Sequence, residues 1–152
     1  MSPLDSSNYD DVGLSEIEAR LKTDLDCLLY PNKNWVPPRK DVTDIVIVGG
    51  GMCGMLAWLS LNNGGMKNIR IIDRSQQGHE GPWLGYARME TLRSPKNLTG
   101  PAYGHGALTF QAWFRAQFGA EAWQDLDKIP RPMWMDYLRW YRRVLNIPIE
   151  NG

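Results

Sequence analysis

Three glycines and one carboxylate stand at spacings that suit the binding of a dinucleotide. Gly49, Gly51 and Gly54 follow a run of β-branched residues at 45–48, and Asp73 lies 22 residues beyond Gly51. In this pattern the first glycine permits a tight turn, the second lets the backbone approach a pyrophosphate, and the third lets a helix pack closely on the strand. A carboxylate roughly 20 residues further on accepts hydrogen bonds from ribose hydroxyls. The spacing predicts a dinucleotide site, and the alternative is a glycine-rich turn that binds nothing.

The elements that must position these residues can be read on either side of the glycines. The run at 45–48 has no polar alternation, which favours a strand buried on both faces, as in a parallel sheet. Apolar residues then recur at helical spacing: Met52, Met55, Leu56 and Leu59. Two asparagines and two glycines at 62–65 end that helix, and a second apolar run at 69–72 leads to Asp73. The helix start would offer free N–H groups and a positive dipole end to a diphosphate.

Composition narrows the function classes. The 152 residues suffice for one domain with a sizeable core, and 17 basic residues balance 17 acidic ones, which gives no electrostatic case for nucleic acid or a membrane surface. We find no apolar stretch of membrane-spanning length and no signal-peptide layout, so we expect a cytoplasmic protein without a membrane partner. The two cysteines, Cys27 and Cys53, form neither a metal motif nor a dithiol motif. No metal site is predicted.

Residues 1–40 are interpreted as a polar tail, an amphipathic helix and a proline-rich linker that precede the domain at 41–152. Ser15 and Glu18 have the spacing of a capping box. One apolar face follows at helical spacing: Leu14, Ile17, Leu21, Leu25 and Leu28. We expect this helix to dock on its own chain rather than on a partner, because amphipathic helices usually face their own core.

Residues 74–106 form a long excursion without a sustained period. A loop this long within a compact domain tends to be functional or disordered. It contains many large apolar residues: Trp83, Leu84, Tyr86, Met89, Leu92, Leu98 and Tyr103. We expect them either to lie across a flat group such as an isoalloxazine ring or to cover an edge of the protein's own sheet.

Two helices are predicted after the excursion. Thr109 can cap the first, whose apolar residues are Phe110, Trp113, Phe114 and Phe118, and Gly119 ends it. The second presents an apolar stripe that we assign to the core: Trp134, Tyr137, Leu138, Tyr141 and Leu145. Three arginines lie largely off that stripe, and we expect them to form a solvated face rather than an anion site: Arg139, Arg142 and Arg143. Another apolar segment begins at 147–149.

Only two parallel strands are evident, whereas a complete nucleotide-binding half has a βαβαβ order with at least a third strand beside the first. The fold class is therefore α/β, an incomplete Rossmann-like dinucleotide-binding fold with a strand-helix-strand unit followed by a long loop and a helical excursion. We expect these residues to be the front part of a larger protein.

Several motifs resemble those of one enzyme group. Residues 45–54 together with 71–74 look like the FAD-binding N-terminus of flavoproteins with two dinucleotide domains. Residues 81–83, Gly-Pro-Trp, are similar to the Gly-Gly-Thr-Trp segment of flavin-containing and Baeyer-Villiger monooxygenases. Residues 91–95 and 108–110 resemble the corresponding excursion in lysine and ornithine N-hydroxylases. The likeness spans about residues 44–151 and places the chain with the FAD/NAD(P)-binding oxidoreductases.

The resemblance implies the FAD-binding part of a class B type monooxygenase that uses NAD(P)H and acts through a C4a-(hydro)peroxyflavin on a small-molecule substrate. Gly49, Gly51 and Gly54 would hold the FAD pyrophosphate, helped by the N–H groups of Met52 and Cys53. Asp73 would bind the adenosine ribose, Arg74 would lie against the adenine, and Trp83 would lie near the flavin. NADPH is expected to bind only in a region outside these residues, so we do not expect turnover by this segment alone. We nominate no catalytic side chain, because the cofactor would carry the chemistry.

Two alternatives stay open at this point. One is the NAD-binding half of a dehydrogenase, to which Asp73 is equally suited. The other is a truncated, non-enzymatic fragment or an interaction module that uses the helix at 15–29. The oligomeric state does not follow from the sequence.

Overall fold

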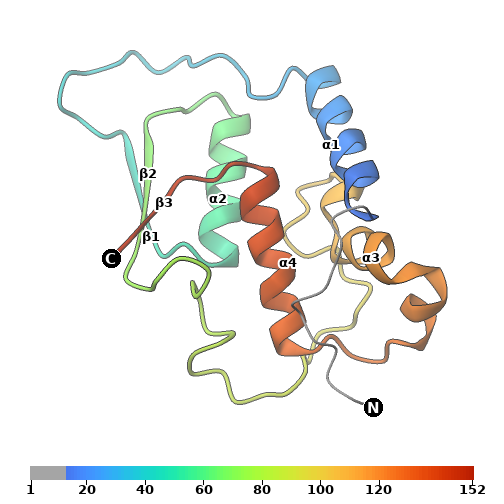
Figure 1. Ribbon diagram of the computed structural model, residues 1–152. Helices are drawn as coiled ribbons and strands as arrows, with labels where there is room; N and C mark the ends of the chain where they lie inside the picture. Colours follow the sequence, from blue (N-terminus) through green and yellow to red (C-terminus); the bar gives the residue numbers. More distant parts are fainter. Residues whose placement is uncertain (1–12) are drawn as a thin grey trace.

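The computed structural model describes residues 13–152. The predicted polar tail at the N-terminus, apart from Gly13, lies outside the described residues. The main elements, in chain order, are α1 (Ser15–Cys27), β1 (Ile45–Val48), α2 (Met52–Asn63), β2 (Ile69–Asp73), the short 3₁₀ helix η2 (Gly106–Leu108), α3 (Phe110–Asp125), α4 (Arg131–Val144) and β3 (Ile149–Asn151). Figure 1 shows the strands side by side, with α2 and α4 on the same side of the sheet. The predicted α/β class and the strand-helix-strand unit are confirmed.

The sheet has three parallel strands in the order β1-β2-β3. Ile47 of β1 lies opposite Ile71 of β2, which in turn lies opposite Ile149 of β3. The sequence showed only the first two strands, because β3 has three residues and offers too short a pattern. The third strand lies beside β2 and not beside β1, so β1 is an edge strand within the described part of the chain.

The prediction that β1 is buried on both faces is wrong for the described residues. Val46 is 50% exposed and Val48 is 83% exposed. On the same face, Ile72 is partly exposed and Arg70 forms an exposed ion pair with Glu150. The opposite face contributes Ile71 and Ile149 to the core beside α2. The β-branched run therefore fits a strand whose second face has no cover among these elements.

The core lies mainly between α3 and α4 and is rich in aromatic rings. Phe110 contacts Trp134 and Tyr137, with ring centroids 5.5 Å away in both cases. The predicted stripe of α4 is buried along its whole length, as expected. Thr109 caps α3 by accepting a hydrogen bond from the Ala112 amide, and the helix is interrupted at Gly119, which has φ +85°. Both of these predictions are confirmed.

Helix α1 docks on its own chain, as expected. Leu14 and Leu21 are buried in the same core as α3 and α4. Glu18 accepts hydrogen bonds from the Trp140 indole at 2.9 Å and from Arg143 at 2.7 Å, which ties α1 to α4.

Two details of α1 differ from the prediction. The helix begins at Ser15 with Leu14 as its N-cap and no side-chain cap, so the capping-box interpretation is wrong. Glu18, the predicted partner in that box, is instead engaged with α4. Leu28 lies just beyond the end of the helix and is 61% exposed, so the apolar face is one residue shorter than its spacing suggested.

The long excursion packs on the helices rather than on a sheet edge. Leu92 and Ala102 are buried in the helical core. Trp83 lies edge-on to Trp134 at 6.1 Å between ring centroids, and Tyr141 donates a hydrogen bond to the Pro101 carbonyl at 2.7 Å. Among the described residues, no helix has the length and apolar character needed to cross a membrane.

Candidate dinucleotide site

The turn between β1 and α2 has a conformation that requires glycine at two positions. Gly49 has φ +105°, in the region that favours glycine. A Cβ placed on Gly54 would lie 1.9 Å from the Gly49 carbonyl oxygen, so only glycine lets α2 approach the end of β1. These are the roles that the sequence pattern assigned to the first and third glycines.

The start of α2 presents backbone donors. Gly51 is the N-cap, and no side chain caps the helix there. The first N–H groups of an α-helix have no acceptor within the helix and lie at the positive end of its dipole. The amides of Met52 and Cys53 belong to this group, so their predicted role as pyrophosphate donors agrees with the geometry. The Met52 side chain itself packs against the core and contributes only its backbone.

Asp73 ends β2 beside this turn and is held by two backbone amides. One carboxylate oxygen accepts a hydrogen bond from Gly50 at 2.7 Å, and the other accepts one from Ser75 at 2.7 Å. Partial burial raises the pKa of Asp73, but hydrogen bonds from the amides of Ser75 and Gly50 and from the Ser75 side chain, together with the charge of Arg74, outweigh that effect and hold the pKa below its usual value. The group is therefore an anion at neutral pH, and each oxygen keeps a further lone pair for a ligand hydroxyl.

A cavity of about 410 Å³ lies between the glycine turn and the end of β2. It brings together six of the eight predicted binding residues: Gly49, Gly51, Cys53, Gly54, Asp73 and Arg74. Val48, Ser75, Gly81 and Tyr86 complete its lining. Sequence reasoning did not single out Ser75, and it named Tyr86 only as one of the large apolar residues of the excursion and Gly81 only as part of the Gly-Pro-Trp segment.

Trp83 is not among the residues that line this cavity. It is half-buried, and its indole nitrogen is a buried donor without an acceptor in the described structure. A Cβ placed on Gly81 would lie 3.5 Å from that nitrogen, so Trp83 stands directly behind the cavity wall. Its predicted place near a flavin stays a prediction.

The residues present fit a bound dinucleotide. The bare glycine backbone and the free amides can receive a pyrophosphate, and the Asp73 carboxylate can accept hydrogen bonds from ribose hydroxyls. The arrangement contains binding groups rather than a nucleophile with its base. It can therefore hold and orient a cofactor that brings its own chemistry.

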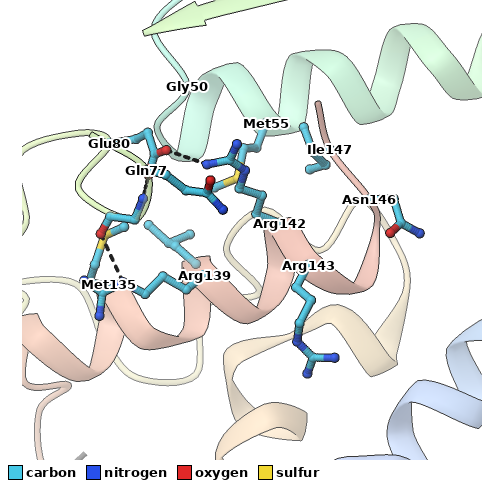
Figure 2. Close-up of a pocket in the computed structure, with 12 residues that line it drawn as sticks. Gly50, Met55, Gln77, Glu80, Met135, Arg139, Arg142, Arg143, Asn146 and Ile147 are labelled. Carbon is cyan, nitrogen blue, oxygen red and sulfur yellow. Dashed lines mark hydrogen bonds and ion pairs between the residues drawn. The ribbon is translucent and has the colours of Figure 1, made fainter. Parts of the chain in front are cut away.

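A second cavity of about 330 Å³ lies on the other side of the glycine turn, between Gly50 and α4. Figure 2 shows three arginines of α4 around it. Arg139 bonds Asp136 and the Gly78 carbonyl, Arg142 bonds Glu80, and Arg143 bonds Glu18. The expectation of three solvated arginines is wrong for Arg142, which is only 16% exposed in its side chain. Because the charges are already paired, this cavity is a poor anion site.

Comparison with known proteins agrees with the geometry. Residues 46–149 match the FAD-NAD(P)-binding family, and the chain belongs to that family. It is an FAD/NAD(P)-binding domain with an incomplete Rossmann-like fold, the class inferred from the sequence.

A curated relative gives a more particular comparison. The chain is 46% identical over 145 residues to the FAD-dependent urate hydroxylase of Xanthomonas campestris pv. campestris. The matched region covers 93% of this chain and 31% of that protein. Family and relative together support FAD as the cofactor of a flavoprotein oxidoreductase. No solved structure gives a significant match.

Proposed function

We propose that this chain is the FAD-binding part of an FAD-dependent monooxygenase that takes its electrons from NAD(P)H and hydroxylates a small molecule. The observation that carries the proposal is the meeting of the glycine turn and Asp73 at one cavity. The hydroxylase part is supported by the 46% identity to a urate hydroxylase, of which the chain spans about a third. Urate is accordingly the first substrate to test with the whole protein. A cytoplasmic location is part of the proposal and can be tested by cell fractionation.

The chain's residues divide the binding task among three positions. Gly51 and the amides at the start of α2 would receive the pyrophosphate. Asp73 would accept hydrogen bonds from the ribose, and Arg74, exposed at the cavity rim, would lie against the adenine. When bound, FAD supplies redox chemistry that none of these side chains can perform.

The test is a titration of the purified chain with FAD, followed by flavin fluorescence and by thermal unfolding. A ligand that binds only the folded state stabilises it by about 2.7 kcal/mol at a hundredfold excess over its dissociation constant. We expect saturable FAD binding and a raised melting temperature, with weaker effects from NAD⁺ and NADP⁺. Tighter binding of NAD⁺ would instead support a dehydrogenase half, and binding of none of the three would contradict a nucleotide function.

A variant and a matched control separate the site from general stability. Gly51→Val places a branched side chain in the cavity and should abolish FAD binding. Gly85→Val is the control, because a Cβ at Gly85 meets no atom within 4 Å. If the Gly51 variant bound FAD as well as the control, the turn would not be the phosphate site.

A further inference from the structure

A buried polar network lies directly behind the cavity that binds the nucleotide in the proposed function. Glu80 is 4% exposed and accepts hydrogen bonds from Arg142 of α4 at 2.6 Å and from Asn151 of β3 at 2.8 Å. Its other oxygen accepts a hydrogen bond from the Gly78 amide at 2.9 Å. Figure 2 shows Arg142 reaching from α4 to Glu80. Both oxygens of this buried carboxylate are thus satisfied by named partners.

Arg142 is itself held in a fixed direction. Its second terminal nitrogen donates to the Ile149 carbonyl at 3.0 Å and to the Asn151 side-chain oxygen at 3.2 Å. The guanidinium therefore bridges a helix, a strand and the loop after β2. A planar guanidinium with several fixed bonds sets geometry more strictly than a point charge does.

The network reaches the nucleotide cavity at two residues of its lining, Gly81 and Ser75. Glu80 immediately precedes Gly81, and a Cβ on Gly51 would lie 3.4 Å from the Gly81 Cα, so these two glycines face each other. Asn151 donates to the Ser75 carbonyl at 2.8 Å, and the Ser75 amide bonds Asp73. Both Ser75 and Gly81 line the cavity.

The segment between these two wall residues has no helix or strand to hold it. Residues 75–81 contain turns and bends, and within them the His79 amide donates a local hydrogen bond to the Gln76 carbonyl. Side-chain contacts from α4 and β3 must therefore fix its position. A buried ion pair is weak support for stability, because desolvation offsets much of the attraction, but its geometry can select one conformation.

We propose that Glu80, through Arg142 and Asn151, is a positioning residue of the FAD site. It does not line the cavity; it sets the separation between the glycine turn and Gly81, and it orients Ser75 against Asp73. The proposal rests on FAD binding as the proposed function. The Glu80→Gln variant keeps the size of the side chain but removes the charge that Arg142 and Asn151 bind.

The test measures FAD affinity and hydrogen–deuterium exchange in the same proteins. Groups in one network couple by about 0.5–3 kcal/mol, which corresponds to roughly a 2- to 150-fold change in affinity. We expect Glu80→Gln to weaken FAD within that range, at a temperature where melting shows the variant to be folded. Exchange should rise in residues 75–82 and stay unchanged in β1 and α2. Glu150→Gln is the control: Glu150 lies on β3 beside Asn151, and the change removes only the charge of its exposed ion pair with Arg70 of β2, so it should change neither readout.

The outcomes distinguish this proposal from the function on which it rests. If the wild type bound FAD and Glu80→Gln had the same FAD affinity and the same hydrogen–deuterium exchange as the wild type, the positioning role would be overturned and the proposed function would stand. If the wild type bound no FAD, the proposed function would fail, and exchange alone would decide whether Glu80 fixes the loop. Should Glu80→Gln fail to fold, Asn151→Ala is the second variant, because it removes the hydrogen bond to the Ser75 carbonyl. It should raise hydrogen–deuterium exchange at residues 75–77 and lower the affinity for FAD. An unchanged Asn151 variant would also count against the proposal.

Discussion

Replacing Gly54 with alanine tests whether close approach of α2 to β1 is what this glycine provides. The added Cβ would lie 1.9 Å from the Gly49 carbonyl oxygen and 3.0 Å from its carbon, and the side chain of Ile47 is 3.3 Å away. Backbone atoms cannot rotate aside as a flexible side chain can. Helix α2 must therefore move away from the turn, or the turn must change its conformation.

The size of the effect follows from two opposing terms. Overpacking in a well-packed site costs typically about 1–3 kcal/mol and occasionally more, and the overlap with backbone argues for the upper end. Alanine regains about 1 kcal/mol of helix propensity relative to glycine. The net loss should be about 2 kcal/mol or more, and at about 2–4 °C per kcal/mol for a chain of this size the melting temperature should fall by about 4–8 °C.

Thermal and urea unfolding, followed by circular dichroism, measure this loss. Gly85→Ala is the matched control, because nothing lies within 4 Å of its added Cβ, and its stability should stay within about 0.5 kcal/mol of the wild type. We also expect Gly54→Ala to weaken FAD, since the Gly49 carbonyl must shift. Equal melting temperatures for the two variants would show that this glycine is not needed for helix-strand packing.

Asp73→Asn should weaken FAD at least about tenfold in a fluorescence titration, because a charge-assisted hydrogen bond is worth about 1.5–3 kcal/mol; unchanged affinity would remove Asp73 from the site. The same carboxylate predicts that stability depends on pH, because the pKa of Asp73 is lower in the folded state than in the unfolded state. Its contribution to the free energy of unfolding is therefore complete above the ordinary pKa of about 3.9 and is lost as the pH falls through the folded-state pKa. Urea unfolding should show the gap between wild type and Asp73→Asn closing as the medium becomes more acidic than that, and a gap that widened there would refute the sign. Tyr137→Phe should cost about 1–3 kcal/mol in the same assay, since it leaves the buried Leu108 carbonyl without its hydrogen bond. Tyr86→Phe, at a 74% exposed position, should cost nothing measurable and serves as its control.

The parts of the fold that sequence predicted best are those with a strong local signature. Gly49, Gly51 and Gly54 have spacings that few other turns share, and Asp73 follows a short apolar run, so their meeting could be predicted from topology. The apolar stripe of α4 could also be predicted, because its large residues recur at helical spacing over three turns. In each case local pattern and tertiary packing point to the same arrangement.

The features that sequence did not reveal depend on contacts between distant segments. Glu80 sits in a loop without a period, and its partners Arg142 and Asn151 come 62 and 71 residues later. Gly50 is an unspecified position in the glycine pattern, yet its amide fixes the Asp73 carboxylate. The exposure of Val48 could not be predicted either, since the sequence of a β-branched strand is the same whether or not its second face is covered.

The uncovered face of the sheet has a practical consequence for the chain in solution. Apolar side chains gather on it at Val46, Val48 and Ile72. They lie beside the outer edge of β1, where no strand pairs among the described residues. An apolar edge strand is a template for pairing between molecules, and a near-zero net charge does little to keep molecules apart. Concentrated samples should therefore self-associate, and charged substitutions at Val46, which is 50% exposed and does not line the nucleotide cavity, offer a direct way to keep the chain monodisperse for FAD titrations.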